Sequence, residues 1–178
     1  LDLVFLHGGD ANRPTTGERA IDTGVFFTRL GQRIIHILST QTAAGQIYDV
    51  DMRLRPSGNS GLLVCSINAF EEYQKKDAWT WEHQALSRAR FVAGSDSLRE
   101  SFNHVRNAVL GKPRELEVLR HDVVEMREKM RESLGTKTPE GTASKEFHVK
   151  HDHGGIVDIE FLCQFCVLAW SHQYPELL

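Results

Sequence analysis

Charged residues of both signs alternate with apolar ones along residues 46–55, whose sequence is QIYDVDMRLR. A β-strand with this period would carry all of its charged side chains on one face: Asp49, Asp51, Arg53 and Arg55. Carboxylates are the ligands that Mg²⁺ prefers, and guanidinium groups bind phosphate oxygens. The structural alternative is a solvated edge strand whose charges pair along its face, and the pattern alone does not separate the two.

A further carboxylate lies in the first segment of the chain, where residues 1–6 read LDLVFL. This short apolar run, followed by a Gly-Gly-Asp turn signal, predicts a buried strand that contains Asp2. An unpaired carboxylate is costly to bury, so Asp2 is expected near a cation or a strong donor. Asp2 and Asp51 on adjacent strands, with arginines beyond them, would suit a divalent metal and a triphosphate.

The elements around these residues follow from periodicity and capping. Asp22 or Thr23 is predicted to cap a helix that runs to Leu38, and residues 40–45 are predicted to form a loop before the strand at 46–55. Residues 62–65 are predicted to be a further strand, and Ser66 the N-cap of a helix that ends near Asp77. The sequence therefore indicates a small sheet with flanking helices.

From residue 78 onward the pattern is helical. Helices are predicted over 78–92, from a cap at Asp96 or Ser97, from Pro113 with an apolar stripe through Leu119 and Val123, and over 156–170. A short alternating stretch, FHVK, precedes the last of these, and residues 135–146 are rich in Gly, Thr, Pro and Ser, which predicts a flexible loop. We predict an α+β (α/β) fold with domains at 1–92 and 93–178, the second including the start of a helical domain.

Weaker signals lie just before the last helix. Lys150 and the Gly154-Gly155 turn precede a helix N-terminus, so the backbone donors would meet an anion there, unless the glycines simply make a tight connection. Asp158 and Glu160 are either acids that support a site or first-turn charges that favour the helix dipole. Side chains that can bind zinc also occur here, at His151, Asp152, His153, Cys163 and Cys166. Because the two cysteines lie within an apolar helical run, core packing is the favoured interpretation.

Composition narrows the functional classes. The formal net charge is −3, with 40% hydrophobic and 25% charged residues, which is typical of a folded globular protein. The chain has no excess of positive charge, so its composition does not predict binding to nucleic acid. No apolar run is long enough to span a membrane. Three cysteines, an odd number, do not suit a disulfide framework and fit a reducing, cytoplasmic compartment. Because an initiator Met is absent, the chain is expected to be a piece of a longer protein.

Blocks of sequence spread over almost the whole chain resemble the glutamine synthetase adenylyltransferase family in the same order: LDLVFLHGG, VDMRLRPSGNSGLLV, WTWEHQALSRAR, VVEMREKMR and GGIVDIEF. That family resembles the DNA polymerase β type of nucleotidyltransferase. The resemblance implies a small mixed sheet as the nucleotidyltransferase core, then a bundle-like helical region. It also implies transfer of AMP from ATP to a tyrosine of glutamine synthetase, which regulates nitrogen assimilation.

The resemblance also implies roles for individual residues. Asp2 and Asp51 would be catalytic and would bind Mg²⁺ or Mn²⁺, and Arg53, Arg55 and Lys150 would contact phosphates. Supporting positions beyond the metal would be Asp49, Asp158 and Glu160. The implied partners are ATP, glutamine synthetase and a PII-type signalling protein.

Two departures from the family pattern affect activity. The first Asp of the family's Asp-x-Asp pair, which would stand before Leu1, and the upstream Gly-rich turn for the triphosphate are not in the sequence. This chain alone is therefore expected to be inactive. The family has an AMP-adding half and an AMP-removing half, and the blocks at 79–90 and 153–161 look more like the adding half. The alternatives are the phosphorolytic, AMP-removing half and a non-catalytic regulatory or interaction module.

Overall fold

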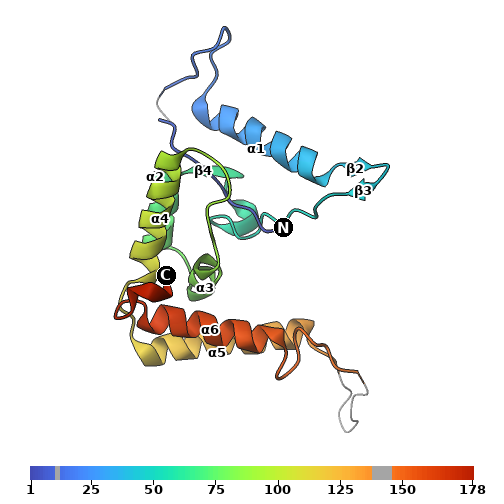
Figure 1. Cartoon of the computed structure of the whole chain (residues 1–178), viewed down its shortest axis with the longest axis vertical. Helices are drawn as coiled ribbons and strands as arrows, with labels where there is room; N and C mark the ends of the chain where they lie inside the picture. The colour runs from blue at the N-terminus through green and yellow to red at the C-terminus, as the bar shows by residue number, and fades with distance from the viewer. Residues whose placement is uncertain (11–12, 138–145) are drawn as a thin grey trace. The chain divides into compact units, whose positions relative to one another are not determined.

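The computed structural model describes residues 1–10, 13–137 and 146–178. The chain divides into two compact units. Unit 1 comprises Leu1–Ala78 and Phe91–Phe102, and unit 2 comprises Trp79–Arg90 and Asn103–Leu178. Helix α4, Asp96–Leu110, begins in unit 1 and ends in unit 2 (Figure 1). The predicted domain boundary between residues 92 and 93 stays a prediction.

Unit 1 is built on a parallel pair of strands, β1 (Phe5–His7) and β4 (Val64–Ser66), in which Phe5 lies opposite Val64 and His7 opposite Ser66. Helix α1, Thr23–Ser39, follows β1 and packs on β4. A Cβ at Gly31 of α1 would lie 2.8 Å from Cγ2 of Val64, so a glycine allows the helix to approach the strand this closely. The remaining strands, β2 (Gln41–Thr42) and β3 (Gly45–Gln46), form an antiparallel hairpin.

Two helices of unit 1 begin where the sequence predicts. The carboxylate of Asp22 accepts a hydrogen bond from Val25 N at 3.0 Å and caps α1. The hydroxyl of Ser66 accepts one from Ala69 N at 3.1 Å and caps α2, Ile67–Lys76. Both caps satisfy backbone N–H groups that the helix itself leaves without partners, which is why such residues mark helix starts.

The strand predicted over residues 46–55 is wrong. Only Gly45–Gln46 is a strand, Asp51 forms a single bridge with Asp2, and the chain turns from Arg53 into the 3₁₀ turn η1, Gly58–Ser60. The turn forms because Pro56 and Gly58 follow, Ser57 adopts a positive φ of 60°, and Arg55 N donates to Met52 O at 3.3 Å. The loop predicted over 40–45 is likewise wrong, because these residues form most of the β2–β3 hairpin.

The buried strand predicted at residues 1–6 is shorter and more exposed than expected. Strand β1 begins at Phe5, and the side chains of Leu1 and Val4 are 53% and 37% exposed. Asp2 is exposed as well. Its carboxylate therefore pays no large desolvation penalty, and the argument that burial demands a cation beside it does not hold.

Unit 2 is helical. Helices α3 (Thr80–Ser87), α5 (Leu116–Leu134) and α6 (Ile156–Trp170) pack against one another, and the 3₁₀ turn η2 (Pro175–Leu177) follows. Leu110 and Leu168 are fully buried in its core, and Leu119 and Val123 face it from α5. The apolar stripe predicted for α5 is thus confirmed at these two positions.

Several predicted boundaries in the helical region shift. The helix expected from Pro113 begins at Leu116, where the Glu115 carboxylate caps it by accepting from Val118 N at 2.7 Å. Ser95, rather than Asp96 or Ser97, caps α4, since its hydroxyl accepts from Leu98 N at 3.3 Å. The helix over 156–170 is confirmed. The short alternating stretch FHVK is not a strand but leads into a turn, and most of the predicted loop at 135–146 lies outside the described residues.

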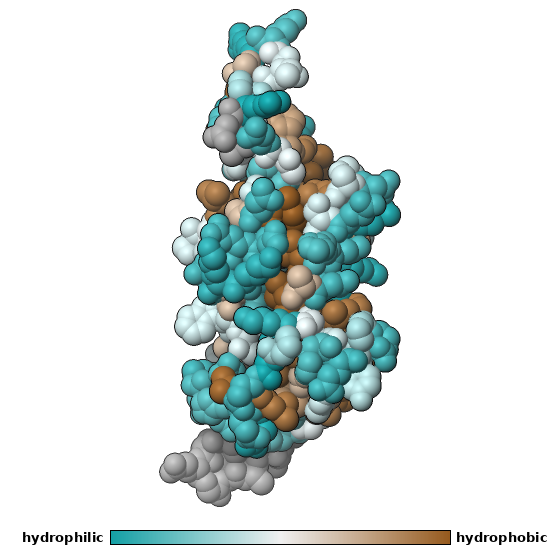
Figure 2. Space-filling model, turned by 90° about the vertical axis from the view of Figure 1, so that its left-hand side faces the viewer, coloured by the Kyte–Doolittle hydropathy of each residue, from teal (hydrophilic) through white to brown (hydrophobic). Residues whose placement is uncertain are grey.

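The helices together with two small two-stranded sheets confirm the α+β fold class. On the face drawn in Figure 2, apolar surface is interspersed with hydrophilic surface. Within the described ranges, no helix combines the length and apolar character needed to cross a membrane.

Candidate active site

Asp2 and Asp51 are direct neighbours in a parallel bridge of unit 1. Two backbone hydrogen bonds surround them: Leu3 N donates to Asp51 O at 2.9 Å, and Asp51 N donates to Leu1 O at 2.9 Å. Neighbouring residues of paired strands project their side chains from the same face of the pleat. The bridge therefore brings the two carboxylates predicted as metal ligands to one face, although the surrounding strand is far shorter than expected.

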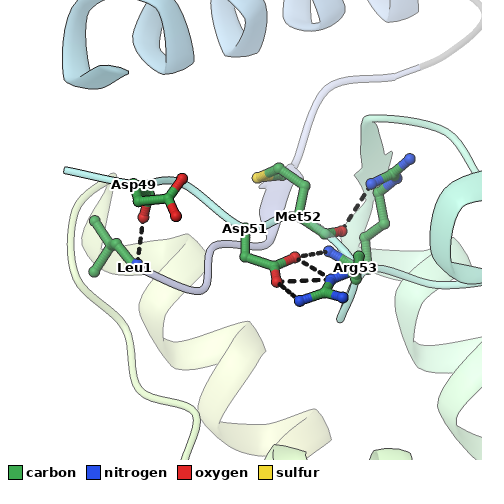
Figure 3. Close-up of polar contacts among 6 residues, drawn as sticks. Leu1, Asp49, Asp51, Met52 and Arg53 are labelled. Atoms are coloured by element: carbon green, nitrogen blue, oxygen red, sulfur yellow. Dashed lines mark hydrogen bonds and ion pairs between the residues drawn. The ribbon is translucent and has the colours of Figure 1, made fainter. Parts of the chain in front are cut away.

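Arg53 binds the carboxylate of Asp51 with its side chain and its backbone (Figure 3). Arg53 N donates to Oδ1 at 2.8 Å and Arg53 Nε donates to Oδ2 at 2.7 Å, while the terminal Nη2 also contacts Oδ2. These hydrogen bonds, with the charge of Arg53, lower the pKa of Asp51 to about 2. Asp51 is therefore a carboxylate anion at neutral pH.

The charge of Asp2 also acts on Arg53. The pKa of Arg53 is raised first by its hydrogen bond to Asp51, then by the charge of Asp51 and, more weakly, by that of Asp2. The side chain of Arg53 is 75% exposed and that of Asp51 29% exposed. Two acids and one exposed arginine thus share an open surface of unit 1, where an anionic ligand can reach the guanidinium.

Arg55 lies in a different setting from Arg53. Its guanidinium donates to the carbonyl oxygens of Met52 at 2.8 Å, Asn59 at 3.3 Å and Gly61 at 3.5 Å. Arg55 therefore braces the loop that follows Asp51, and it does not contact either carboxylate. Asp49 is exposed, and it contacts Leu1 through its backbone, because its carbonyl oxygen accepts from Leu1 N at 2.5 Å (Figure 3).

The donor set at this face fits a divalent metal of the Mg²⁺ type. Asp2 and Asp51 supply hard oxygen atoms from two carboxylates, and Mg²⁺ is commonly bound by one or two carboxylates together with phosphate oxygens. Arg53 occupies oxygen atoms of Asp51, and its exposed side chain can leave them without disturbing a core. Among the residues that the structure describes, no group of three or more His, Cys, Asp or Glu side chains is placed to hold a metal ion.

The other predicted site residues lie in unit 2. Lys150 is exposed in the turn before α6. Asp158 is paired with the buried Arg127, whose Nε lies 2.5 Å from Asp158 Oδ1, and Glu160 is paired with Arg88 at 3.0 Å. Both acids are thus held by arginines of the same unit.

The predicted anion site on the backbone donors of the Gly154-Gly155 turn is wrong. Gly154 N donates to Asp158 Oδ2 at 2.6 Å and Gly155 N donates to Asp152 O at 2.9 Å. The next two N–H groups, of Ile156 and Val157, donate to the carbonyl oxygens of Val149 and Lys150. The tight-connection alternative describes this turn, and the side chain of Lys150 is the group that remains for an anion.

Sequence reasoning missed Arg127, which is 6% exposed and organises this turn. The signal was present, because Arg127 follows Leu119 and Val123 at four-residue steps and so belongs to the buried stripe of α5. A buried arginine requires an acidic partner, and Asp158 provides it.

Among the described residues, the cysteines belong to no cluster of three or more His, Cys, Asp or Glu side chains that could hold zinc. Cys65, Cys163 and Cys166 are free, and Cys65 is buried, which raises the pKa of its thiol to about 11. Cys163 is exposed on α6 and Cys166 is half-buried. Cys163 is therefore not the core residue that the packing interpretation predicted.

The comparison with known families adds the decisive observation. A family profile described as glutamate-ammonia ligase adenylyltransferase matches residues 1–105. The chain belongs to the glutamate-ammonia ligase adenylyltransferase family. Asp2, Asp51 and Arg53 all lie within the matched range.

Curated relatives in this family are closely similar over the whole chain. The bifunctional glutamine synthetase adenylyltransferase/adenylyl-removing enzyme of Hahella chejuensis is 57% identical over 178 residues, which is 100% of this chain and 18% of the relative. The enzyme of that name from Pseudomonas putida is 59% identical over 185 residues, 100% of this chain and 19% of the relative. That from Vibrio parahaemolyticus is 54% identical over 99% of this chain and 18% of the relative. The chain thus spans about a fifth of the length of the adenylyltransferases that it matches.

Proposed function

We propose that this chain is part of an enzyme that transfers AMP from ATP to a tyrosine of glutamine synthetase and thereby regulates nitrogen assimilation. The observation that carries the proposal is the bridge between Asp2 and Asp51, which brings two carboxylates to one face beside Arg53. Membership of the adenylyltransferase family and the names of the relatives support the substrate. The proposal concerns the longer protein, because the chain covers 18–19% of these relatives.

In this reaction the tyrosine hydroxyl attacks the α-phosphorus of ATP. A bond forms between the tyrosine oxygen and the α-phosphorus, the bond from the α-phosphorus to its bridging oxygen breaks, pyrophosphate leaves, and the hydroxyl proton passes to water. Arg53 offers a forked donor to the phosphate oxygens once it swings away from Asp51. Arg55 keeps the loop after Asp51 in place and, with Lys150, is proposed to face phosphates.

Asp2 and Asp51 would hold Mg²⁺ or Mn²⁺ through their carboxylate oxygens. Such an ion neutralises charge on the phosphates and lowers the pKa of a bound hydroxyl. The carboxylate of Asp51 is suited to this role because its pKa of about 2 keeps it ionised at neutral pH. Asp49 is proposed to support these two carboxylates from outside the ligand set. Asp158 and Glu160, which are paired with Arg127 and Arg88, are proposed to support residues of unit 2.

The proposed partners are ATP, glutamine synthetase and, by resemblance to the family, a PII-type signalling protein. A cytoplasmic location is proposed, supported by the three free cysteines. The helical unit 2 offers exposed apolar side chains on α6, such as Ile159 and Leu162, for contacts with further protein.

The test is product identification with the full-length protein, purified glutamine synthetase and a divalent metal. The proposal predicts ATP-dependent labelling of glutamine synthetase with AMP and release of pyrophosphate from the unmodified substrate. Phosphate-dependent release of ADP from adenylylated glutamine synthetase would assign this half of the protein to AMP removal, provided that Asp51→Asn abolishes it. If Asp51→Asn changes neither reaction, the chain is a non-catalytic module.

A further inference from the structure

The turn that carries Lys150 is closed by its own backbone. Ile156 N donates to Val149 O at 3.0 Å and Val157 N donates to Lys150 O at 3.1 Å. A Cβ at Gly155 would lie 2.6 Å from Val149 O and 3.0 Å from Lys150 O, so no side chain fits inside the turn. The backbone of Lys150 is therefore held against the first turn of α6.

A buried ion pair ties this turn to α5. Arg127 Nε lies 2.5 Å from Asp158 Oδ1, and Arg127 Nη2 donates to His151 O at 2.8 Å. The other oxygen of Asp158 accepts from Gly154 N at 2.6 Å. The side chain of Arg127 is 7% exposed, so one guanidinium from the core bonds both to the turn and to α6. Such a fork positions two elements at once, which an ammonium group cannot do in the same geometry.

A second anchor lies at the outer end of the turn. The carboxylate of Asp152 accepts from Thr136 N, Thr136 Oγ1 and His148 N, each at 2.7 Å. These bonds lower the pKa of Asp152 to about 2, with the Thr136 hydroxyl as the largest cause. The turn that carries Lys150 thus has two carboxylate anchors: Asp152, which is bonded to Thr136 just after α5, and Asp158, which is paired with Arg127 within α5.

Positive charge is in excess at this turn. Arg127 and Arg131 both approach the same oxygen of Asp158, at 2.5 and 3.6 Å. Arg127 Nη1 and Arg131 Nε are buried and have no hydrogen-bond partner among the residues that the structure describes. The pKa of His151 is lowered by desolvation and then by the charges of His148, Lys150 and Arg127. Arg127 and Arg131 share the single carboxylate of Asp158, so the balance of these three charges is positive and favours an anion nearby.

The side chain of Lys150 is the accessible member of this cationic group. It is exposed, and among the described residues its ammonium has no hydrogen-bond or ion-pair partner. Lysine binds phosphate as a point charge on a flexible stem, so its aim depends on where its backbone is held. The hydrogen bonds and the ion pair that hold this turn fix the position of the Lys150 backbone.

We propose that Arg127 is a positioning residue, which acts through Asp158 and the turn backbone to hold Lys150 where its ammonium binds a phosphate of a nucleoside triphosphate. This inference rests on the proposed function and deepens it. Arg127 itself does not touch the nucleotide. Its effect on nucleotide binding therefore exists only while Lys150 is present.

The experiment is a double-mutant cycle on the full-length protein with ATP as the probe, measured by calorimetry. Lys150→Met is expected to raise the Kd for ATP about 10-fold, and Arg127→Lys about fivefold. In the Lys150→Met background, Arg127→Lys is expected to change the Kd less than about 1.5-fold. Arg120→Lys is the matched control, since Arg120 lies on the same helix in an exposed pair with Glu117, and it is expected to leave the Kd unchanged.

Equal losses from Arg127→Lys in both backgrounds, or no loss in either, would overturn the inference, as would a wild-type protein that does not bind ATP. If Arg127→Lys unfolds the protein by circular dichroism, Asp152→Ala replaces it, because this half-exposed anchor holds the same turn. Transfer of AMP with an unchanged Kd in Lys150→Met removes the inference and leaves the function. If the two substitutions are coupled in ATP binding but the protein transfers no AMP, the proposed function is removed and the role of Arg127 in positioning Lys150 is kept.

Discussion

Asp2 and Asp51 lie side by side because Leu3 N and Leu1 O bond to the backbone of Asp51, each at 2.9 Å. The position of this pair depends on backbone hydrogen bonds and not on a contact between the carboxylates themselves. Substituting either side chain should therefore leave the bridge intact. This separation of backbone from side chain makes the pair suitable for tests by conservative substitution.

The pKa of Asp51 should depend on Arg53. The hydrogen bonds from Arg53 lower this pKa from 3.8 to about 2, so the pair stabilises the folded chain above about pH 4 and loses that contribution as the pH falls through about 2. In Arg53→Met the pKa should return toward 3.8, as measured by carboxylate NMR titration of the 178-residue chain. Arg120→Met, which removes the partner of Glu117, is the control and should leave the Asp51 titration unchanged.

Arg55→Ala should destabilise unit 1. The substitution removes side-chain donors from the carbonyl oxygens of Met52, Asn59 and Gly61. Met52 O keeps its bond from Arg55 N and the bond to Asn59 O is exposed, so a loss of about 1 kcal/mol in the free energy of unfolding is expected. Urea unfolding measures the change. Arg29→Ala on the exposed side of α1 should change it by less than about 0.5 kcal/mol. Equal effects of the two substitutions would show that Arg55 does not brace the loop.

Gly61→Ala should be destabilising for lack of space. The φ of Gly61 is −81°, which any residue adopts, but a Cβ there would lie 1.9 Å from Pro56 O. Because the obstacle is backbone, the loop must shift, and a loss of about 2 kcal/mol or more is expected in urea unfolding. At Gly17 a Cβ would meet no described residue within 4 Å, so Gly17→Ala should be neutral or slightly stabilising. A neutral Gly61→Ala would contradict the loop geometry.

Leu168→Ala should destabilise unit 2 strongly. Leu168 is 0% exposed on α6, and truncation of a buried leucine costs about 2–5 kcal/mol. Leu162 lies on the same helix and is 62% exposed, so Leu162→Ala should cost less than about 1 kcal/mol in the same thermal or urea unfolding experiment. Similar losses at both positions would mean that the buried face of α6 is wrongly assigned.

Local signals predicted the helices of this chain well. The caps at Asp22 and Ser66 act within three residues, and the helix at 156–170 is a predominantly apolar segment. The strand at 46–55 failed although its alternation was strict. There, the turn chemistry of Pro56 and Gly58 and the bond from the Arg55 side chain to Met52 O outweigh the period-two pattern.

The candidate site was predictable in its residues more than in its geometry. The bridge brings Asp2 and Asp51 to one face as expected, whereas the exposure of Asp2 was not expected. The pairing of Arg127 with Asp158 joins two helices that are distant in sequence, and a single sequence gives no sign of such a partner. Charged residues are expected at the surface by default, so Arg127 was overlooked.

The most direct test of the account is the rate of AMP transfer to glutamine synthetase by the full-length protein carrying Asp2→Asn or Asp51→Asn. Both variants keep the backbone bridge and remove one carboxylate charge, and each is expected to lower the rate at least about 100-fold. Asp77→Asn, at an exposed position after α2, is the control and should retain the wild-type rate. Folded Asp2→Asn and Asp51→Asn proteins with rates near that of the control would contradict a catalytic role for the pair.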